Sequence, residues 1–203
     1  GISTAPIVFA RSADEAPRAA ERVGFPVVLK IESPDITHKS DVGGVALGLA
    51  NAGDVGAAYE RMHSQVAQYA PTAKITGVIV QRMAGAGLEM ILGINRDPLF
   101  GPVVLCGFGG ILVELLKDVV VGIPPLSFEQ ARDMIARLRG FPILAGVRGK
   151  PAADIDSLCH AIVGVSHLAM SLGNQLAGLD INPLIVLPKG EGVIAVDAVV
   201  EIK

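Results

Sequence analysis

The sequence predicts an α/β fold made of two α+β lobes. Segments rich in apolar and β-branched residues alternate with segments in which apolar residues recur every three to four positions, a pattern typical of mixed strand and helix proteins. A stretch of alanine and glycine at 84–87 separates two such sets. A chain of 203 residues is long enough for two small lobes that face each other across a cleft. We therefore place one lobe at residues 1–83 and the other at 84–203.

Composition narrows the functional classes. Of all residues, 51% are hydrophobic and 18% are charged, which is typical of a well-buried globular protein. No apolar run reaches the roughly 20 residues that a membrane span needs, and no signal peptide is recognisable at the N-terminus. A net charge of −3 without a long basic run gives no reason to expect nucleic acid. Two isolated cysteines suit neither a disulfide scaffold nor a zinc site. We expect a cytoplasmic protein with no membrane or nucleic-acid partner.

In the first lobe, helices and strands alternate. Ser12 and Glu15 have capping-box spacing, which predicts a helix that ends at Gly24. Asp54 is the predicted cap of a second helix that runs to about residue 69. The predicted strands cover residues 26–31, 45–49 and 75–83.

Between the first two of these strands lies a polar loop. Lys30 stands near the end of the first strand, and the Ser33-Pro34 dipeptide disfavours helix, so an ordered loop should hold His38 between two strands. The pair Gly43-Gly44 allows the backbone to approach a ligand closely or to adopt positive φ. Such a loop is suited to presenting chemically active groups.

The second lobe should contain several strands and two helices. Asp97–Gly101 is a turn by composition, and residues 111–123 are ambiguous, although we favour strand. Ser127 with Gln130 predicts a helix that stops at Gly140, and a longer amphipathic helix starts at Asp154. The predicted strands are 88–95, 103–106 and a terminal hairpin of 176–186 and 193–199.

Polar side chains interrupt this apolar hairpin. Asp180 and Asn182 are two residues apart and share one face of the strand, and Asp197 on the returning strand can lie opposite them. Oxygen ligands on adjacent strands suit Mg²⁺, which proteins hold with one or two groups while phosphates and water complete the shell. The alternative is ordinary polarity at a turn and an edge strand.

Six segments together resemble the ATP-grasp domain of the ADP-forming acyl-CoA synthetases of the acetate–CoA ligase type, which are relatives of succinyl-CoA synthetase. The segments are residues 25–30, 33–45, 89–93, 96–102, 107–110 and 180–184. The run His38-Lys39-Ser40-Asp41-Val42-Gly43-Gly44 is the most diagnostic, because succinyl-CoA synthetases lack this histidine signature. The resemblance implies an ATP-grasp fold, with two α+β lobes that enclose a nucleotide cleft.

The resemblance also implies a reaction, acyl-CoA + ADP + phosphate ⇌ carboxylate + CoA + ATP. In this family a CoA-binding ligase subunit or domain binds the CoA thioester and the carboxylic acid and carries a first phosphohistidine. A second histidine in the ATP-grasp part passes the phosphoryl group to ADP, and here it would be His38. A neutral imidazole with a pKa of about 6.5 is a suitable nucleophile for such a relay. We recognise no CoA-binding domain in the sequence, so we expect the chain to need a partner.

The same resemblance implies further roles. Lys30 would contact the phosphates of ATP or ADP, as a point cation suited to phosphoryl transfer. Asn182 and Asp197 would bind Mg²⁺, with Asp180 as a weaker candidate. The other expected nucleotide contacts are the adenine hinge with Val80, Gln81 and Met83, then Glu89 in the cleft, and Gly109, Gly110 and Arg148 near the phosphates.

Other interpretations stay open. A lysine at a strand end or a lone histidine in a loop is often only solvated, and His63, His160 and His167 on predicted helices are expected to be structural or surface residues. A nucleotide-sensing regulatory module of a multidomain acyltransferase is the main alternative function. A carboxylate–amine ligase fits less well, since those enzymes use a free acyl phosphate and no histidine relay.

Overall fold

The computed structural model describes residues 2–36, 39–110, 118–147, 149 and 151–203. The chain divides into a smaller unit, Ala5–Met83, and a larger unit formed by Gly1–Thr4 with Ala84–Lys203. Each unit has its own sheet and its own buried core. The first strand, β1 (Ser3–Thr4), pairs in parallel with a strand near the C-terminus, which is why the first four residues belong with the larger unit.

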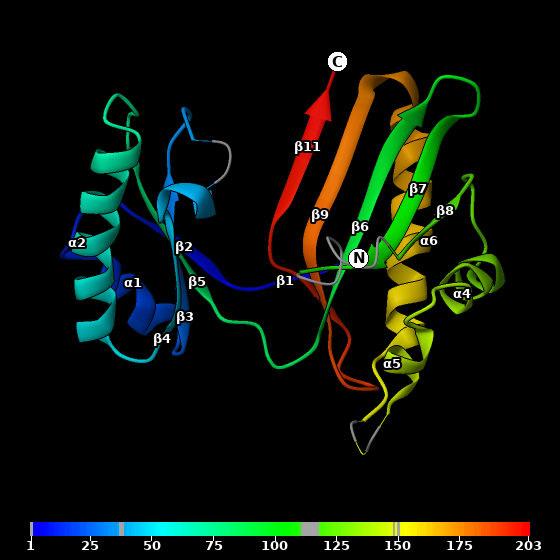
Figure 1. The fold of residues 1–203 in the computed structure, drawn as a ribbon, viewed down its shortest axis with the longest axis horizontal. Coiled ribbons are helices and arrows are strands. Elements are labelled where there is room, and N and C mark those ends of the chain that lie inside the picture. Colours follow the sequence, from blue (N-terminus) through cyan, green and yellow to red (C-terminus); the bar gives the residue numbers. More distant parts are fainter. Residues whose placement is uncertain (1, 37–38, 111–117, 148, 150) are drawn as a thin grey trace. The chain divides into compact units, whose positions relative to one another are not determined.

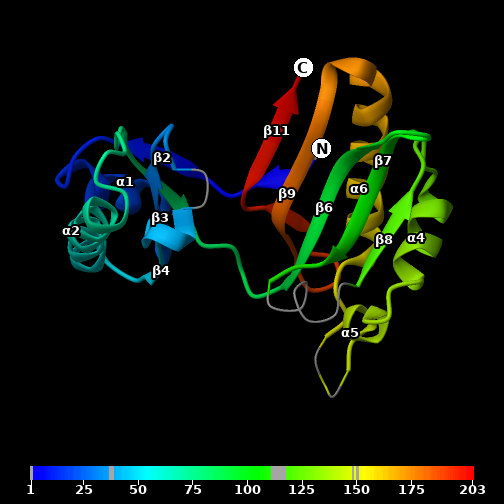
Figure 2. The same ribbon diagram turned by 45° about the horizontal axis from the view of Figure 1, so that its top comes forward.

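The smaller unit is an antiparallel sheet with two helices packed on one face (Figure 2). The strand order is β2-β5-β3-β4, and every neighbouring pair is antiparallel. Side chains from both helices share one apolar cluster with alternate residues of the strands. The elements are β2 (Ile7–Ala10), α1 (Glu15–Val23), β3 (Val27–Glu32), the 3-10 turn η1 (Lys39–Val42), β4 (Val45–Leu49), α2 (Ala52–Tyr69) and β5 (Gly77–Arg82).

Helix ends in this unit follow the local sequence, with two corrections. The predicted Ser12–Glu15 capping box is incomplete, because α1 begins at Glu15 after Asp14 and the Glu15 carboxylate accepts from Arg11 N rather than from Ser12 N. The Ser12 side chain accepts from the backbone N–H of Glu15 at 3.2 Å, and α1 ends at Gly24, whose φ is 83°. The cap of α2 is Asn51 rather than the expected Asp54, because the Asn51 side chain accepts from Asp54 N at 3.0 Å. Asp54 lies in the first helical turn, and its carboxylate accepts from Ala50 N at 3.2 Å.

The larger unit contains a seven-stranded sheet with helices packed on it (Figure 1). The strand order is β1-β10-β9-β6-β7-β8, and β11 also pairs with β9. Helix α6 runs along β6, β7 and β9, while α4 contacts α6 and β8. The elements are β6 (Leu88–Asp97), β7 (Gly101–Phe108), β8 (Val119–Gly122), α4 (Phe128–Ala136), α5 (Phe141–Ala145), α6 (Ile155–Leu172), η2 (Gly173–Gln175), β9 (Leu176–Val186), β10 (Val193–Ala195) and β11 (Ala198–Ile202).

Three sequence predictions for this unit need comment. The strand favoured within 111–123 is present as β8, while 111–117 lie outside the described residues. The capping box at Ser127 is confirmed, but the expected end at Gly140 is wrong, since α4 stops at Ala136. The returning strand of the terminal hairpin is split into β10 and β11. Because Pro183 has no N–H, it cannot continue the ladder, and the break between β10 and β11 lies opposite it.

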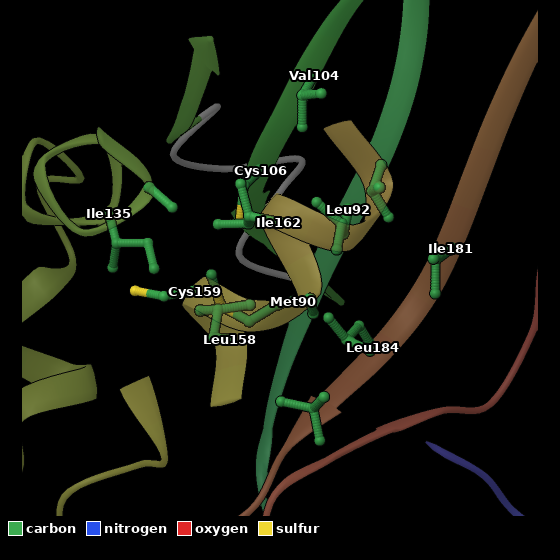
Figure 3. Packing of buried hydrophobic residues seen from close by; sticks show 14 of the residues in the cluster. Met90, Leu92, Val104, Cys106, Ile135, Leu158, Cys159, Ile162, Ile181 and Leu184 are labelled. Carbon is green, nitrogen blue, oxygen red and sulfur yellow. The ribbon is translucent and has the colours of Figure 1, made fainter. Parts of the chain in front are cut away.

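The core of the larger unit lies between the sheet and the helices α4, α5 and α6. Figure 3 shows Met90 and Leu92 of β6 close to Leu158 and Ile162 of α6. Cys106 and Cys159 belong to the same cluster, and burial raises the pKa of the Cys106 thiol to about 12, which keeps it protonated. The segment Ile155–Gln175 is long and apolar enough to span a membrane by length and composition alone. Its apolar residues are accounted for by this packing, since one side of α6 is buried in the core.

Polar side chains fix α6 at both ends. At its start Asp154 is buried, and its carboxylate accepts from Ser157 N at 3.1 Å, Gly190 N at 3.0 Å and Gly192 N at 2.9 Å. Beyond its end, the Arg96 guanidinium donates to Gly173 O at 2.8 Å and to Asn174 Oδ1 at 2.7 Å. The helix is therefore joined to the β9–β10 turn at one end and to β6 at the other.

The pKa of Asp154 predicts acid sensitivity of the larger unit. Burial raises this pKa, but the hydrogen bonds from backbone N–H groups together outweigh burial, and the net shift is downward. A lowered folded-state pKa means that the stabilisation is complete above the unfolded value of about 4 and is lost as pH falls through the folded value. We expect Asp154→Asn to lower the free energy of unfolding at pH 7 by about 1–3 kcal/mol.

The measurement is urea unfolding of wild type and variant between pH 7 and pH 3, where the two free energies should converge as wild-type Asp154 is protonated. Asp156→Asn is the matched control, because Asp156 is exposed on the same helix and pairs with exposed Arg132 at 3.3 Å. Its effect should be small. An Asp154 variant as stable as wild type at pH 7 would contradict this account.

Candidate functional site

In the smaller unit, the far face of the sheet, meaning the face turned away from α1 and α2, carries Lys30 and Gln81. On β3 the residues Leu29 and Ile31 point into the helix-packed cluster, so Lys30 between them lies on the far face. Lys30 is opposite Ile79 of β5, and Gln81 on the same strand is also on this face and is 4% exposed. The structure therefore brings these two predicted residues onto one surface.

The other two predicted hinge residues are placed differently. Val80 is 0% exposed and belongs to the cluster between sheet and helices, so it presents no surface to a ligand. Met83 is 40% exposed, and its backbone N–H donates to Pro26 O at 2.9 Å. The Val80 side chain therefore faces the helices and the Gln81 side chain faces the far side of the sheet, and contact of the Val80–Met83 backbone with adenine stays a prediction.

The loop that contains His38 is anchored on both sides, and His38 itself lies outside the described residues. On the first side, the Asp35 carboxylate accepts from Lys74 N at 2.7 Å and Ile36 is 7% exposed. On the second side, Lys39 Nζ lies 4.0 Å from Glu32 Oε2, on the strand of Lys30. These contacts hold the described flanks of the loop against the sheet.

Gly43 and Gly44 have different backbone surroundings. Gly43 adopts a φ of 70°, in the left-handed region. Gly44 lies close to β3, since its carbonyl accepts from Ile31 N at 2.8 Å. Its N–H donates to Lys39 O in η1 at 2.7 Å. A Cβ at Gly44 would lie 2.7 Å from Ile31 Cγ2. Gly44 thus packs closely on β3, and an approach of this backbone to a ligand stays a prediction.

In the larger unit, the far face is the sheet face turned away from α4, α5 and α6, and it carries the predicted metal ligands. Asp180 and Asn182 are exposed on β9, whereas Leu179 and Ile181 next to them are buried in the core. Asp197 lies between β10 and β11 rather than in the expected strand, and its carbonyl accepts from Asn182 N at 3.1 Å. The three predicted ligands therefore come from one small region.

The two carboxylates lie near enough to influence each other electrostatically. Partial burial raises the pKa of Asp180, and the negative charge of Asp197 raises it further. In the described part of the chain, no group of three or more His, Cys, Asp and Glu residues could hold a metal ion. Two carboxylates and one amide oxygen match the sparse protein ligation of Mg²⁺, in which substrate phosphates supply further oxygens. The donor set therefore fits this ion when a nucleotide is present.

Glu89 and the glycines Gly109 and Gly110 form a second group on this unit. Gly109 N donates to Glu89 O at 2.7 Å. Gly110 has a φ of 59°, and a Cβ there would lie 2.6 Å from Glu89 Oε2. The Glu89 carboxylate therefore lies against Gly110. Arg148, which was predicted to lie near the same phosphates, is outside the described residues.

A hollow of about 250 Å³ lies next to Asp180 on the far face of the larger unit. Its polar lining comes from Asn95, Asp180 and Glu201, and its apolar lining includes Leu105 and Val199. Asp180 therefore borders a concave part of the surface. The sequence pattern predicts neither Asn95 nor Glu201 as part of this surface.

The sequence interpretation also missed the apolar part of the far face in the smaller unit. Ile7 and Phe9 of β2 lie on the strand next to β5 and are 60% and 42% exposed, opposite Gln81 and Ile79. The signal was available, because Ile7-Val8-Phe9-Ala10 is a short apolar run of strand-forming residues bounded by Pro6 and Arg11. These side chains extend an apolar surface beside Lys30.

Comparison with known proteins identifies relatives of the whole chain. The ATP-grasp domain family matches residues 1–202. The chain is 40% identical over 194 residues to the ADP-forming acetate–CoA ligase II subunit beta of Pyrococcus furiosus, with 96% of this chain and 82% of that subunit covered. It is 43% identical over 194 residues to the ADP-forming acetate–CoA ligase I of Archaeoglobus fulgidus, and the match covers 96% of this chain but spans only 28% of that longer protein.

A solved relative is acetyl-coenzyme A synthetase 1 of Ca. Korarchaeum cryptofilum. Its complex with coenzyme A, Ca-AMPCP and HgCl+ matches with a TM-score of 0.94 and 39% identity, covering 100% of this chain and 87% of that chain. Another structure of that protein holds coenzyme A and Mg-AMPPCP, with its phosphohistidine segment pointing towards the nucleotide binding site. This second match has a TM-score of 0.83 and 36% identity, and covers 100% and 86% of the two chains.

The contact between Gly44 and β3 predicts a large effect of a single methyl group. We expect Gly44→Ala to destabilise the smaller unit by about 1–3 kcal/mol, because the added Cβ would overlap Ile31 and the Lys39 carbonyl. Gly56→Ala in α2 is the matched control, since nothing lies within 4 Å of a Cβ there, and it should stabilise by about 0.5–1 kcal/mol. Urea unfolding measures both effects, and a Gly44 variant with unchanged stability would show that the loop does not pack as described.

Proposed function

Because the chain belongs to the ATP-grasp family of the ADP-forming acetate–CoA ligases, we propose that it is the nucleotide-binding, phosphoryl-transfer part of an ADP-forming acyl-CoA synthetase. The family resemblance and the ATP-grasp fold expected from the sequence are confirmed by the matches. The proposed overall reaction is acyl-CoA + ADP + phosphate ⇌ carboxylate + CoA + ATP. The observation that carries the proposal is the grouping of Asp180, Asn182 and Asp197 on the far face of the larger unit.

This group is proposed to bind Mg²⁺ together with the phosphates of ADP or ATP. Asn182 and Asp197 are the primary ligands, and Asp180 is an additional candidate. Burial, and then the negative charge of Asp197, raise the pKa of Asp180, and a divalent cation bound here would offset the repulsion between the two carboxylates. When bound, the ion would neutralise charge on the phosphates during transfer.

On the smaller unit, Lys30 is proposed to contact the nucleotide phosphates. Lys30 lies on the far face of β3, and β3 is paired on both sides, so the backbone that carries the ammonium group is held in place. A point cation neutralises negative charge that builds up in phosphoryl transfer without taking part in the bond changes. Gln81 and Met83 are proposed to contact the adenine, and Glu89, Gly109, Gly110 and Arg148 are proposed to line the rest of the nucleotide site.

His38 is the proposed phosphoryl carrier. A neutral nitrogen of the His38 imidazole attacks the phosphoryl group of the partner's phosphohistidine, and the N–P bond to the partner's imidazole breaks. A β-phosphate oxygen of ADP then attacks the phosphoryl group on His38, which breaks the N–P bond to His38 and forms ATP. The segment around His38 would have to leave its anchors if donor and acceptor lie far apart. The pair Lys39–Glu32 is partly exposed, and such pairs contribute no more than about 1 kcal/mol, so that this contact is easily opened.

The partner is proposed to be a CoA-binding subunit or domain that carries the first phosphohistidine. Two arrangements occur among the relatives, since one match spans most of a beta subunit and the other spans 28% of a longer ligase. The CoA thioester and the carboxylic acid would bind to that partner, which would also determine the acyl group. The protein is also proposed to act in the cytoplasm.

The decisive variant is His38→Ala, tested with the CoA-binding partner, acetyl-CoA, ADP and ³²P-labelled phosphate. Wild type should acquire acid-labile label on His38 and form ATP, whereas the variant should lose the label and at least about 1000-fold of its rate of ATP formation. Binding of ADP, measured by calorimetry, should change by no more than about twofold, because the imidazole is a carrier and not an anchor.

His167→Ala is the matched control, since His167 is exposed on α6, and it should retain both the label and the rate. ATP formation by the His38 variant at the wild-type rate would contradict the relay. Nucleotide binding without any label in wild type would instead support the alternative of a nucleotide-sensing module.

A further inference from the structure

We propose that Asp118 is a positioning residue for the nucleotide site, which holds the glycine segment Gly107–Gly110 in place through a buried hydrogen-bond network. The inference rests on the proposed function, in which Gly109 and Gly110 lie along the nucleotide phosphates. Asp118 immediately precedes β8 and is 6% exposed. A buried carboxylate is unusual unless its oxygens are satisfied.

Among the described residues, the carboxylate of Asp118 contacts the connection between α4 and α5. Its Oδ1 accepts from Arg139 N at 3.0 Å, and its Oδ2 accepts from Gly140 N at 2.7 Å. Arg139 Nε lies 3.9 Å from Oδ1 on a side chain that is 74% exposed. Both oxygens therefore face backbone N–H groups, which makes Asp118 the link between this connection and the strand that follows it.

The backbone of Asp118 contacts the end of β7. Its carbonyl accepts from Phe108 N at 3.3 Å. Gly107 packs so closely that a Cβ there would lie 2.6 Å from the Asp118 carbonyl. Gly140 in turn packs against the Phe108 ring, where a Cβ would lie 2.5 Å from Phe108 Cε2. Asp118 thus connects the α4–α5 connection to the glycine segment, so that a shift of one is transmitted to the other.

Glu89 holds the opposite side of the same segment. Gly109 N donates to Glu89 O, and Gly110 lies against the Glu89 carboxylate, as described above. Glycines near phosphates are useful only when their N–H groups are held in fixed directions, because an isolated glycine has more backbone freedom than any other residue. The contacts from Glu89 and from Asp118 supply that restraint from two sides.

The experiment compares nucleotides that differ only in their phosphates. Asp118→Asn keeps the shape of the side chain but turns an amide NH₂ toward one of the two backbone N–H groups, which loosens the network. If Asp118 positions the phosphate-contacting glycines, the dissociation constant of MgADP should rise by about tenfold, while that of adenosine should change by no more than about twofold. Calorimetry on the full chain measures both ligands.

Asp154→Asn is the matched control. Asp154 is also 6% exposed and also accepts from backbone N–H groups of the larger unit, but its partners Gly190 and Gly192 lie in the β9–β10 turn. It should leave the ratio of the MgADP and adenosine constants as in wild type, even if it lowers stability as much as Asp118→Asn. This control separates positioning of the phosphate contacts from loss of stability alone.

Three results would overturn the inference. Asp118→Asn could bind MgADP as wild type does, it could weaken MgADP and adenosine equally, or Asp154→Asn could change the ratio as much. If Asp118→Asn does not fold, Asp118→Glu is measured in its place, because it keeps the charge but displaces both oxygens, and the same ratio decides. Failure of wild type to bind MgADP at all would refute the proposed function together with this inference, whereas normal wild-type binding with an unchanged ratio would refute this inference alone.

Discussion

Both sheets of this protein pack their helices on one face, and this packing decides where polar chemistry can lie. On a strand, successive side chains point to opposite faces, so each residue buried against a helix places its neighbours on the far face. Lys30 lies between Leu29 and Ile31, and Asp180 lies between Leu179 and Ile181. The burial of the core residues thus orients the proposed nucleotide and metal contacts, and a one-residue shift of register would bury them.

The supports of these faces are mostly backbone groups held by a few polar or charged residues, of which Asp118 and Asp154 are buried. Asp154 and Arg96 fix the two ends of α6, whose apolar side packs on β6, β7 and β9. Asp118 and Glu89 hold the glycine segment at the end of β7. None of these four needs to contact a ligand to matter, because a binding site requires its contact groups at fixed positions and its supports supply that order.

Much of the fold was predictable, because its signals are local. The capping box at Ser127, the long periodic helix α6 and the alternation that groups Asp180 with Asn182 depend on residues within a few positions of one another. The split of the returning strand also has a local cause, because Pro183 on the facing strand has no N–H for the ladder. Asn51 rather than Asp54 caps α2, since two good capping residues stood within one turn and pattern alone did not rank them.

What could not be predicted depends on contacts between distant segments. Asp118 contacts Gly140, 22 residues away, and Lys39 contacts Glu32 only after the loop has folded back on β3. Val80 was grouped with Gln81 as a hinge residue, although adjacent strand residues face opposite sides, and only the packing of the helices shows which one is buried. Strand register and packing decide which side chains face the helices. The sequence pattern predicts these orientations only once the core residues are known.

The proposed Mg-nucleotide contacts lie on the far face of each sheet, and methyl NMR during titration with MgADP tests them most directly. Resonances of Ile79 in the smaller unit and of Ile91 and Ile185 in the larger unit should shift, while those of Val55 and Ile162 in the helix-packed cores should stay. The combined variant Asn182→Ala with Asp197→Ala should need at least about tenfold more MgADP for the same shifts. Shifts confined to the helix-packed cores, or equal affinity in the combined variant, would contradict the account.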